Sequence, residues 1–170
     1  MNVRHALVET TLGQITLVAS GNMITGLYFP RHLRRPARES FGERVAVEHD
    51  ALLGDAATQL GEYLSGGRRA FDLPLDADGD AFQHSVWSVV AEVPFGETTT
   101  YGAIAERLGD KALAYRVGQA VAANPLCVFV PCHRVLGANG KLTGYAGGLE
   151  RKRALLELEE PAPVSAGRLF

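Results

Sequence analysis

Cysteine, methionine and tryptophan are scarce in this sequence, which has two, two and one of them among 170 residues. Two cysteines cannot form the disulfide framework on which small secreted proteins depend. No stretch is of low complexity, and a content of 46% apolar and 21% charged residues excludes a collagen or a disordered chain. The sequence therefore indicates an ordinary globular protein, built as one compact domain or as two small domains packed together.

Long apolar runs and a large excess of one charge are also missing. The longest uncharged, mostly apolar run covers residues 120–132, well short of the ~20 residues that cross a bilayer. Residues 1–5 are not followed by the apolar segment of a signal peptide, so we expect a cytoplasmic protein with no membrane partner. The net charge of −2 argues against an extended electrostatic contact with nucleic acid but is compatible with a small, locally positive one.

The first half of the chain has the pattern of a sheet followed by a helix. Apolar and polar residues alternate in three stretches over residues 3–29, with turn residues at Gly13 and Gly21, and this predicts an antiparallel meander. Apolar residues at i, i+3 and i+4 spacing predict an amphipathic helix over residues 50–64. Residues 71–75 alternate as a last strand.

Residues 30–38 form a separate feature, because they combine two prolines with four arginines. Proline interrupts helices, so the segment is expected to be an exposed loop. A solvated basic loop is the simpler interpretation, and a specific DNA contact is the alternative.

The second half is predicted to be mainly helical. Helices are expected over residues 82–93, 100–108, 112–123 and 149–159, and a short buried strand over residues 126–130. Only Gly109, Asp110 and Lys111 separate the two middle helices, which is the pattern of a helix-turn-helix.

These elements define an α/β protein of the α+β type. Residues 1–78 would form a small domain with an antiparallel sheet and a helix, residues 79–160 a mainly helical domain with the helix-turn-helix, and residues 161–170 a tail. The boundary falls in the acidic, turn-prone segment 76–80.

Cys132 is the residue whose side chain has the clearest potential for reactivity. A thiol reacts as the thiolate, and a nearby base or a helix N-terminus favours that form. His133 is next to Cys132, but adjacent side chains point in different directions, so a bridging water fits better than a direct hydrogen bond. A catalytic histidine is usually held by a third group, for which Glu157 and Glu159 are the candidates.

Two other interpretations of this thiol are open on the same residues. A single cysteine beside a histidine is commonly a buried, inert thiol. Cys127, Cys132 and His133 are also of zinc-ligand type, but their spacing matches no closed set of four ligands.

The surrounding stretch resembles one family. Residues 131–135 read Pro-Cys-His-Arg-Val, Asn124 and Pro125 precede them, and residues 144–149 read Gly-Tyr-Ala-Gly-Gly-Leu, followed by Lys152. This combination closely resembles the O6-alkylguanine-DNA alkyltransferase family. The resemblance covers residues 82–159, whereas the first half resembles the family only in layout.

The resemblance implies DNA repair by direct reversal. Cys132 would take a methyl or other alkyl group from O6 of a guanine in duplex DNA and keep it as a thioether, so that each molecule of this methylated-DNA–protein-cysteine methyltransferase acts once. The damaged base must be flipped out of the duplex to reach the thiol, while the helix-turn-helix holds the DNA. No cofactor and no metal are implied, and we expect a monomer whose partner is double-stranded DNA containing O6-alkylguanine.

The resemblance also assigns roles to individual residues. His133 would be the water-mediated base, Glu159 its orienting partner, Asn124 the hinge before the active-site strand, and Tyr101 the proton donor toward the leaving guanine. The base pocket would consist of Tyr145, Val135, Ala146 and Gly147. Gly118, Ala122 and Arg134 would lie against the DNA.

Two departures from the family pattern concern substrate handling. The family usually has an arginine on the recognition helix that fills the space left by the flipped base; here Tyr115 is in that register and Arg116 is one position later. An aromatic ring can stack on exposed bases, so we favour Tyr115 for this role, with Arg116 as the alternative. Ala146 replaces a serine that some members use to contact the guanine.

Two other functions fit parts of the pattern. Alkyltransferase-like proteins recognise the damaged base without transferring the group, but they lack the acceptor cysteine that Cys132 supplies here. Helix-turn-helix regulators of the same family carry a cysteine-rich metal-binding module, which two cysteines cannot build. The sequence therefore predicts a DNA-repair enzyme.

Overall fold

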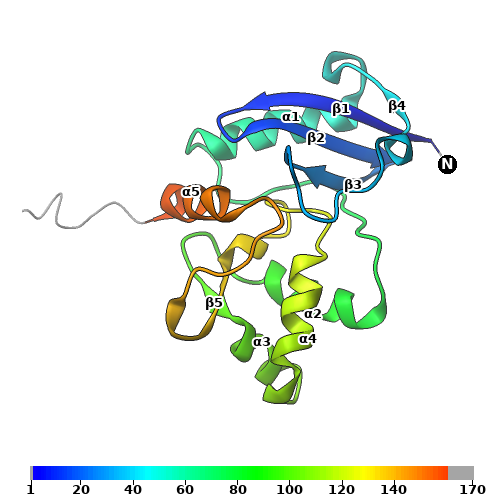
Figure 1. The fold of residues 1–170 in the computed structure, drawn as a ribbon. Coiled ribbons are helices and arrows are strands. Elements are labelled where there is room, and N and C mark those ends of the chain that lie inside the picture. Colours follow the sequence, from blue (N-terminus) through cyan, green and yellow to red (C-terminus); the bar gives the residue numbers. More distant parts are fainter. Residues whose placement is uncertain (1, 161–170) are drawn as a thin grey trace, which may run out of the picture.

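The computed structural model describes residues 2–160, with a sheet-and-helix part above a mainly helical part (Figure 1). The sheet has four strands in the order β3-β2-β1-β4. β1 (Val3–Thr10), β2 (Gly13–Ser20) and β3 (Met23–Tyr28) form the predicted antiparallel meander. β4 (Glu43–Arg44) pairs parallel with β1, so the sheet is mixed; a strand of two residues has no alternation that could predict it.

β2 is buried on both of its faces. On one side it is covered by α1 (Ala51–Leu64), which Figure 1 shows behind the strands. Leu17 of β2 and Leu53 of α1 are fully buried between the sheet and this helix. The predicted helix is confirmed, and Asp50 caps it by accepting a hydrogen bond from the Leu53 N–H at 3.0 Å. On the opposite face of the sheet a second apolar cluster is formed by Val18, Tyr28 and Phe41.

Two segments of the first half differ from the prediction. Residues 30–38 form a loop that is not exposed throughout: His32 is 7% exposed, and its Nδ1 accepts a backbone N–H at 3.1 Å. The predicted strand over residues 71–75 is wrong, because only Leu75 pairs with the sheet, in an isolated parallel bridge to Ile24. The proline within this segment has no N–H to donate to a ladder.

The helical part confirms the predicted helix-turn-helix. α3 (Tyr101–Arg107) and α4 (Ala114–Ala122) are separated by a turn that contains the 3₁₀ helix η3 (Lys111–Leu113). α2 (Ala81–Ala91) packs against α4, where the Trp87 indole N–H donates to the Ala120 carbonyl at 2.8 Å. The last helix, α5 (Leu149–Glu159), has the predicted bounds.

The remaining elements are short. They are the parallel pair β5 (Thr99–Thr100) and β6 (Val135–Leu136), and the 3₁₀ helices η1 (Arg38–Phe41), η2 (Val47–His49), η4 (Cys132–Arg134) and η5 (Ala138–Gly140).

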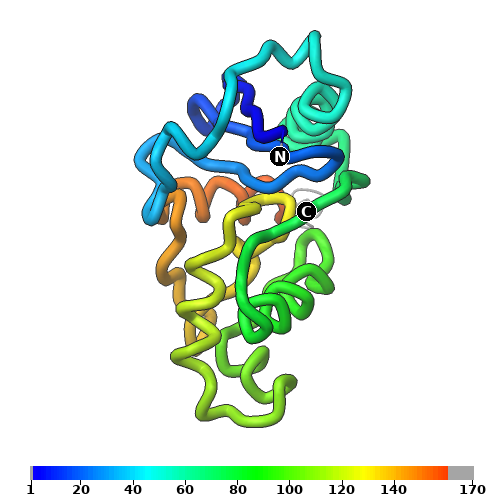
Figure 2. Tube along the Cα trace, turned by 90° about the vertical axis from the view of Figure 1, so that its right-hand side faces the viewer, coloured from blue at the N-terminus to red at the C-terminus, as the bar shows by residue number. Residues whose placement is uncertain are grey.

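The segment before Cys132 joins the two parts of the molecule. The predicted strand over residues 126–130 is wrong, because the backbone turns at Val128, whose φ is 74°. A β-branched residue rarely adopts such a φ, so an apolar run gives no warning of the turn. The Leu27 N–H, near the end of β3, donates to the Pro125 carbonyl at 2.9 Å, and Figure 2 shows the sheet directly above this yellow segment. The sheet therefore fixes the backbone that leads to the thiol.

One apolar core extends through both parts. The predicted domain boundary at residue 78 lies in the irregular segment between α1 and α2, and the predicted tail, residues 161–170, lies outside the described residues. Within residues 2–160, no helix combines the length and the apolar character needed to span a membrane.

Candidate active site

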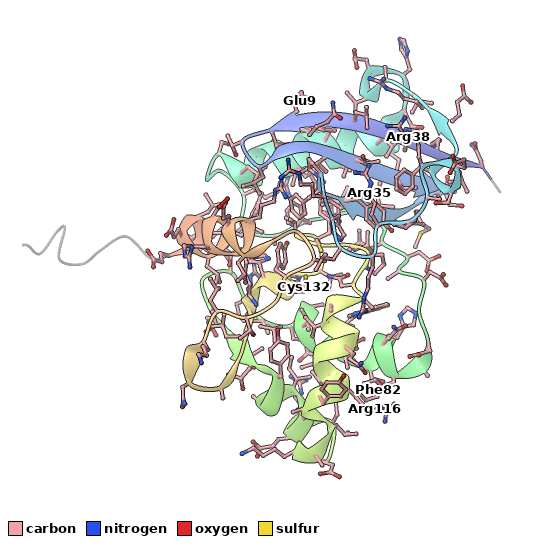
Figure 3. The ribbon with its side chains drawn as sticks, in the orientation of Figure 1. Glu9, Arg35, Arg38, Phe82, Arg116 and Cys132 are labelled. Atoms are coloured by element: carbon pink, nitrogen blue, oxygen red, sulfur yellow. The ribbon has the colours of Figure 1, made fainter. Side chains whose placement is uncertain are left out.

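Cys132 is the first residue of η4 and is 3% exposed. It forms part of the wall of a cavity of about 170 Å³, and Figure 3 shows it between the sheet and the helices. The rest of the wall consists of Leu33 and Arg34 from the loop 30–38, Tyr101, Gly118, Val121, Ala122, Gly144, Tyr145 and Ala146. Hollows of about 640 and 560 Å³ lie at the start of α5 and beside α1, but no cysteine lines them. The cavity at Cys132 is therefore the candidate active site.

His133 is fully buried next to Cys132. Its Nε2 is 2.8 Å from Oε2 of Glu159, so Nε2 carries the proton and donates it to the carboxylate. Nδ1 is then the unprotonated nitrogen, and it is buried without a hydrogen-bond partner among residues 2–160. Burial lowers the pKa of His133, although the neighbouring carboxylate opposes this effect. The result is a neutral imidazole with one nitrogen free to accept a proton.

Glu159 accepts hydrogen bonds from several directions. The Arg134 guanidinium donates through Nε and Nη2, both at 2.8 Å, the Gly96 N–H lies at 3.3 Å, and the Tyr63 hydroxyl donates to Oε2. Burial alone would raise the pKa of this carboxyl, but the bonds from His133 and Arg134 outweigh it and hold the pKa far below its ordinary value. Glu159 therefore stays ionised and orients the histidine.

Three placements around this carboxylate correct or extend the sequence prediction. Glu157, the second candidate, is exposed on another face of α5. Arg134, predicted to lie against the DNA, is instead 7% exposed, with its guanidinium bound to Glu159 and the Val93 carbonyl, so its charge stays inside the protein. Tyr63 comes from α1 and has no sequence signal, because its position in the helix has the pattern of an ordinary core residue.

The Cys132 thiol makes its side-chain contact with a second thiol. Sγ of Cys127 is 3.8 Å from Sγ of Cys132, and this contact lowers the pKa of Cys132 against the opposing effect of burial. Among residues 2–160, Cys132 and His133 share no direct hydrogen bond, so the water-mediated contact between them stays a prediction. In the same part of the chain, no three His, Cys, Asp or Glu side chains are grouped to hold a metal ion, and the zinc interpretation has no structural counterpart.

Asn124 stabilises the turn that precedes Cys132 through two side-chain hydrogen bonds. The residue is 2% exposed; its Nδ2 donates to the Val130 carbonyl at 3.0 Å, and its Oδ1 accepts the Leu126 N–H at 2.9 Å. The predicted hinge residue therefore lies at the junction between α4 and the active-site segment.

Lys152 adds positive charge behind the thiol. It is fully buried, and its Nζ donates to the carbonyls of Val135, Thr143 and Gly144 at 2.6, 2.6 and 3.1 Å. Burial lowers the pKa of Lys152 to about 8, and its charge helps to lower the pKa of Cys132.

The structure brings two of the four predicted base-pocket residues to the cavity. Tyr145 and Ala146 line it, and the Tyr145 hydroxyl is buried without a hydrogen-bond partner in the described part of the chain. Val135 and Gly147 are not part of the wall. The Val135 carbonyl is already bonded within the core, and Gly147 packs against the ring of Phe29, where a Cβ atom would collide with it.

The outer rim of the cavity is formed by α4 together with Leu33 and Arg34 of the loop 30–38. Gly118 and Ala122 line the cavity, and Tyr115 lies on the same helix face and is 77% exposed. Arg116 points about 100° around the helix from Tyr115. Its guanidinium lies 4.1 Å from the centre of the Phe82 ring. Figure 3 shows the two side chains next to each other. Tyr115 therefore projects beside the cavity, with its hydroxyl accepting a hydrogen bond from Gln119 Nε2 at 3.2 Å, whereas the exposed Arg116 stacks on Phe82.

Comparison with known proteins extends these observations to the whole chain. Residues 81–161 match the DNA-binding domain of 6-O-methylguanine DNA methyltransferase, and residues 3–77 match the ribonuclease-like domain of the same family. A methylated-DNA–protein-cysteine methyltransferase of Mycobacterium bovis is 39% identical over 168 residues and 99% of both chains. That of Methanosarcina acetivorans is 49% identical over 155 residues, which cover 91% of this chain and 97% of the relative.

Solved structures give the same result. The crystal structure of Mycobacterium tuberculosis O6-methylguanine methyltransferase is 38% identical in sequence and matches 99% of both chains with a TM-score of 0.84. The OGT of that organism in complex with DNA is 39% identical and has a TM-score of 0.81 over 94% of this chain and 96% of that chain.

Proposed function

Because this chain belongs to the 6-O-methylguanine DNA methyltransferase family, we propose that it repairs DNA by moving an alkyl group from O6 of guanine to Sγ of Cys132. The observation that carries the proposal is the thiol in the wall of a cavity of about 170 Å³, beside a neutral His133 held by the buried Glu159 carboxylate. A thiol at this depth cannot reach a base inside a duplex, so the alkylated nucleotide must flip into the cavity.

The groups around the cavity support an SN2 displacement. Nδ1 of His133 accepts the Cys132 proton through a water, and the thiolate attacks the alkyl carbon. The S–C bond forms as the C–O6 bond breaks, and the electron pair goes to the guanine. Tyr101, in the cavity wall, protonates the guanine and regains its proton from solvent. Glu159 stabilises the imidazolium. The thioether is not readily cleaved, so each molecule acts once.

We propose that α4 enters the minor groove of the DNA. Gly118 and Ala122 have no bulk to prevent a close approach, and Tyr115 extends from the same face to fill the space left by the flipped base. A small contact of this kind suits a protein with a net charge of −2. The complete set of reacting groups comes from one chain, so we infer a monomer that acts in the cytoplasm, where thiols stay reduced.

The test is the intact mass of the protein after incubation with a duplex that contains O6-methylguanine. We expect a gain of one methyl group, located on Cys132 by peptide mapping, after which the protein is inert. Cys132→Ala should gain no mass but still bind the methylated duplex, because the groups that flip the base are unchanged. A methyl group on Cys127, or repair of more duplex than there is protein, would contradict the proposal. Binding of wild-type protein without transfer would indicate a recognition protein instead.

A further inference from the structure

Cys127 is a buried nucleophilic group that the proposed reaction does not use. It lies in the turn before Cys132 and is fully buried. Its Sγ is 3.8 Å from Sγ of Cys132 and 3.8 Å from the Asn124 carbonyl oxygen, so its S–H, a weak donor, has two acceptors within reach.

Among residues 2–160, the hydrogen bond with Cys127 is the contact that lowers the pKa of Cys132 most. The Nε2 proton of His133 is directed to Glu159, and the three donors of Lys152 are directed to backbone carbonyls. The Asn124 amide donates one N–H to the Val130 carbonyl, and its hydrogen bond to the Cys132 sulfur makes a smaller contribution than Cys127 to the lowered pKa of Cys132. A thiolate buried here would be costly without donors, and Cys127 is in position to supply one beside the Asn124 amide.

We propose that Cys127 is a positioning residue for the acceptor thiolate, and that its S–H turns from the Asn124 carbonyl to Sγ of Cys132 when Cys132 loses its proton. This inference rests on the proposed transfer to Cys132. In the resting pair, Cys132 donates to Cys127, and Cys127 donates to Asn124. Once the Cys132 proton has moved toward His133, the Cys132 sulfur can only accept. Rotation of the Cys127 thiol hydrogen then satisfies it, and Cys127 keeps its own proton throughout.

The titratable groups around this pair come from several elements. They are His133 on η4, Lys152 on α5, Tyr145 in the loop before α5 and Tyr28 on β3, and Tyr101 and Arg34 line the same cavity as Cys132. Burial raises the pKa of both tyrosines, so they stay neutral. Burial lowers the pKa of Lys152 to about 8, so Lys152 titrates in the range of interest. Lys152 is present in wild type and in every variant, and the charge on Cys132 raises its pKa, so the two groups titrate together in each protein.

The experiment compares Cys127→Ala, which has no donor, with Cys127→Ser, which keeps a short O–H donor. Alkylation of Cys132 by iodoacetamide is followed by peptide mass mapping across a range of pH, beside single-turnover methyl transfer from the methylated duplex. Loss of the donor raises the pKa of Cys132 and leaves less thiolate at neutral pH. We expect Cys127→Ala to slow both reactions roughly 10-fold at neutral pH, which is the effect of one pKa unit, and to match wild type at alkaline pH. Cys127→Ser should restore most of the neutral-pH rate.

Leu126→Ala is the matched control, because it removes a buried side chain from the same turn without removing a donor. It should lower the melting temperature and leave the pH of half-maximal iodoacetamide rate unchanged. A Cys127→Ala profile that coincides with wild type, or that is lowered equally at every pH, would overturn the inference. If Cys127→Ser does not fold, the Cys127→Ala profile decides. Wild-type protein that reacts with iodoacetamide but takes no methyl group from DNA would refute the proposed function and leave the role of Cys127 intact.

Discussion

The two sides of the active-site cavity are built in opposite ways. On the inner side, Cys132, His133 and Glu159 are at most 3% exposed, and both carboxylate oxygens are bound by protein donors. On the outer side, α4 presents Tyr115 at 77% exposure, next to the small residue Gly118. The protein therefore already holds His133 and Glu159 in place on the inner side, whereas Tyr115 on the outer side is exposed and available for contact with a partner. We expect this difference to separate residues that control the rate of transfer from residues that control DNA binding.

Among changes on the inner side of the cavity, we expect Glu159→Gln to have the largest effect on stability and on the rate of transfer. The amide has the same shape, but its NH₂ group would face the donors of Arg134, His133 and Tyr63, and Arg134 would stay buried without a counter-charge. We expect a loss of about 3–5 kcal/mol in the free energy of unfolding, as is typical when a buried ion pair loses one partner, and slower methyl transfer. Urea unfolding and single-turnover rates measure both effects.

Glu157→Gln is the control for this change, because Glu157 lies on the exposed face of α5. It should alter neither the urea midpoint nor the transfer rate. An effect of Glu157→Gln with a silent Glu159→Gln would contradict the assignment of Glu159 as the partner of His133.

The lowered pKa of Glu159 predicts how the free energy of unfolding depends on pH in the acidic range. The pKa of Glu159 in the folded protein lies below its ordinary value of 4.5, so its charge stabilises the fold above that pH. The contribution is lost as the pH falls from that range toward the lower, folded pKa. Glu159→Gln lacks this contribution, and its unfolding free energy should therefore fall less steeply than that of wild type in acid. Parallel curves from urea unfolding at a series of acidic pH values would show that Glu159 is not the group concerned.

The sequence predicts the inner side well where the information is local or periodic. The spacing of apolar residues predicts α1 to within one residue, and the bounds predicted for α5 agree with the structure. The segment around Cys132 identifies the thiol and His133, whereas the residues alone leave both Glu157 and Glu159 open and the family resemblance selects Glu159. Contacts across long separations have no such signal: Tyr63 is 96 residues from Glu159. The turn that brings Cys127 to Cys132 depends on the positive φ of one residue, Val128. An apolar run contains no signal for such a turn, so it could not be predicted from the sequence.

The outer side can be tested with Tyr115→Ala and Arg116→Ala. Tyr115 projects from the face that meets the cavity, and stacking of an aromatic ring on an exposed base contributes about 1–3 kcal/mol. We expect Tyr115→Ala to weaken binding of the methylated duplex and to slow transfer by this amount, with little change in salt dependence. Arg116→Ala should mainly reduce the salt slope, because a guanidinium stacked on Phe82 can reach at most a phosphate. Binding and single-turnover rates at low and high salt separate the two; a large rate defect for Arg116→Ala with a silent Tyr115→Ala would reverse the assignment.

Tyr63→Phe is the change with the smallest expected effect. It tests whether α1, in the sheet-and-helix part, stabilises the inner side of the cavity. The Tyr63 hydroxyl extends from α1, donates to Oε2 of Glu159 and lies 3.4 Å from Nε2 of His133. Its removal deletes one hydrogen bond to a charged group, while Arg134 and His133 still hold the carboxylate, so we expect a loss of about 1–2 kcal/mol in unfolding free energy. The transfer rate should change less than in Glu159→Gln, because the orientation of His133 is kept.

Tyr28→Phe is the control, since the Tyr28 hydroxyl makes no hydrogen bond among the described residues, and it should change stability by less than about 0.5 kcal/mol. Equal losses in the two variants, measured by urea unfolding, would show that this hydroxyl does not couple α1 to the histidine and its carboxylate.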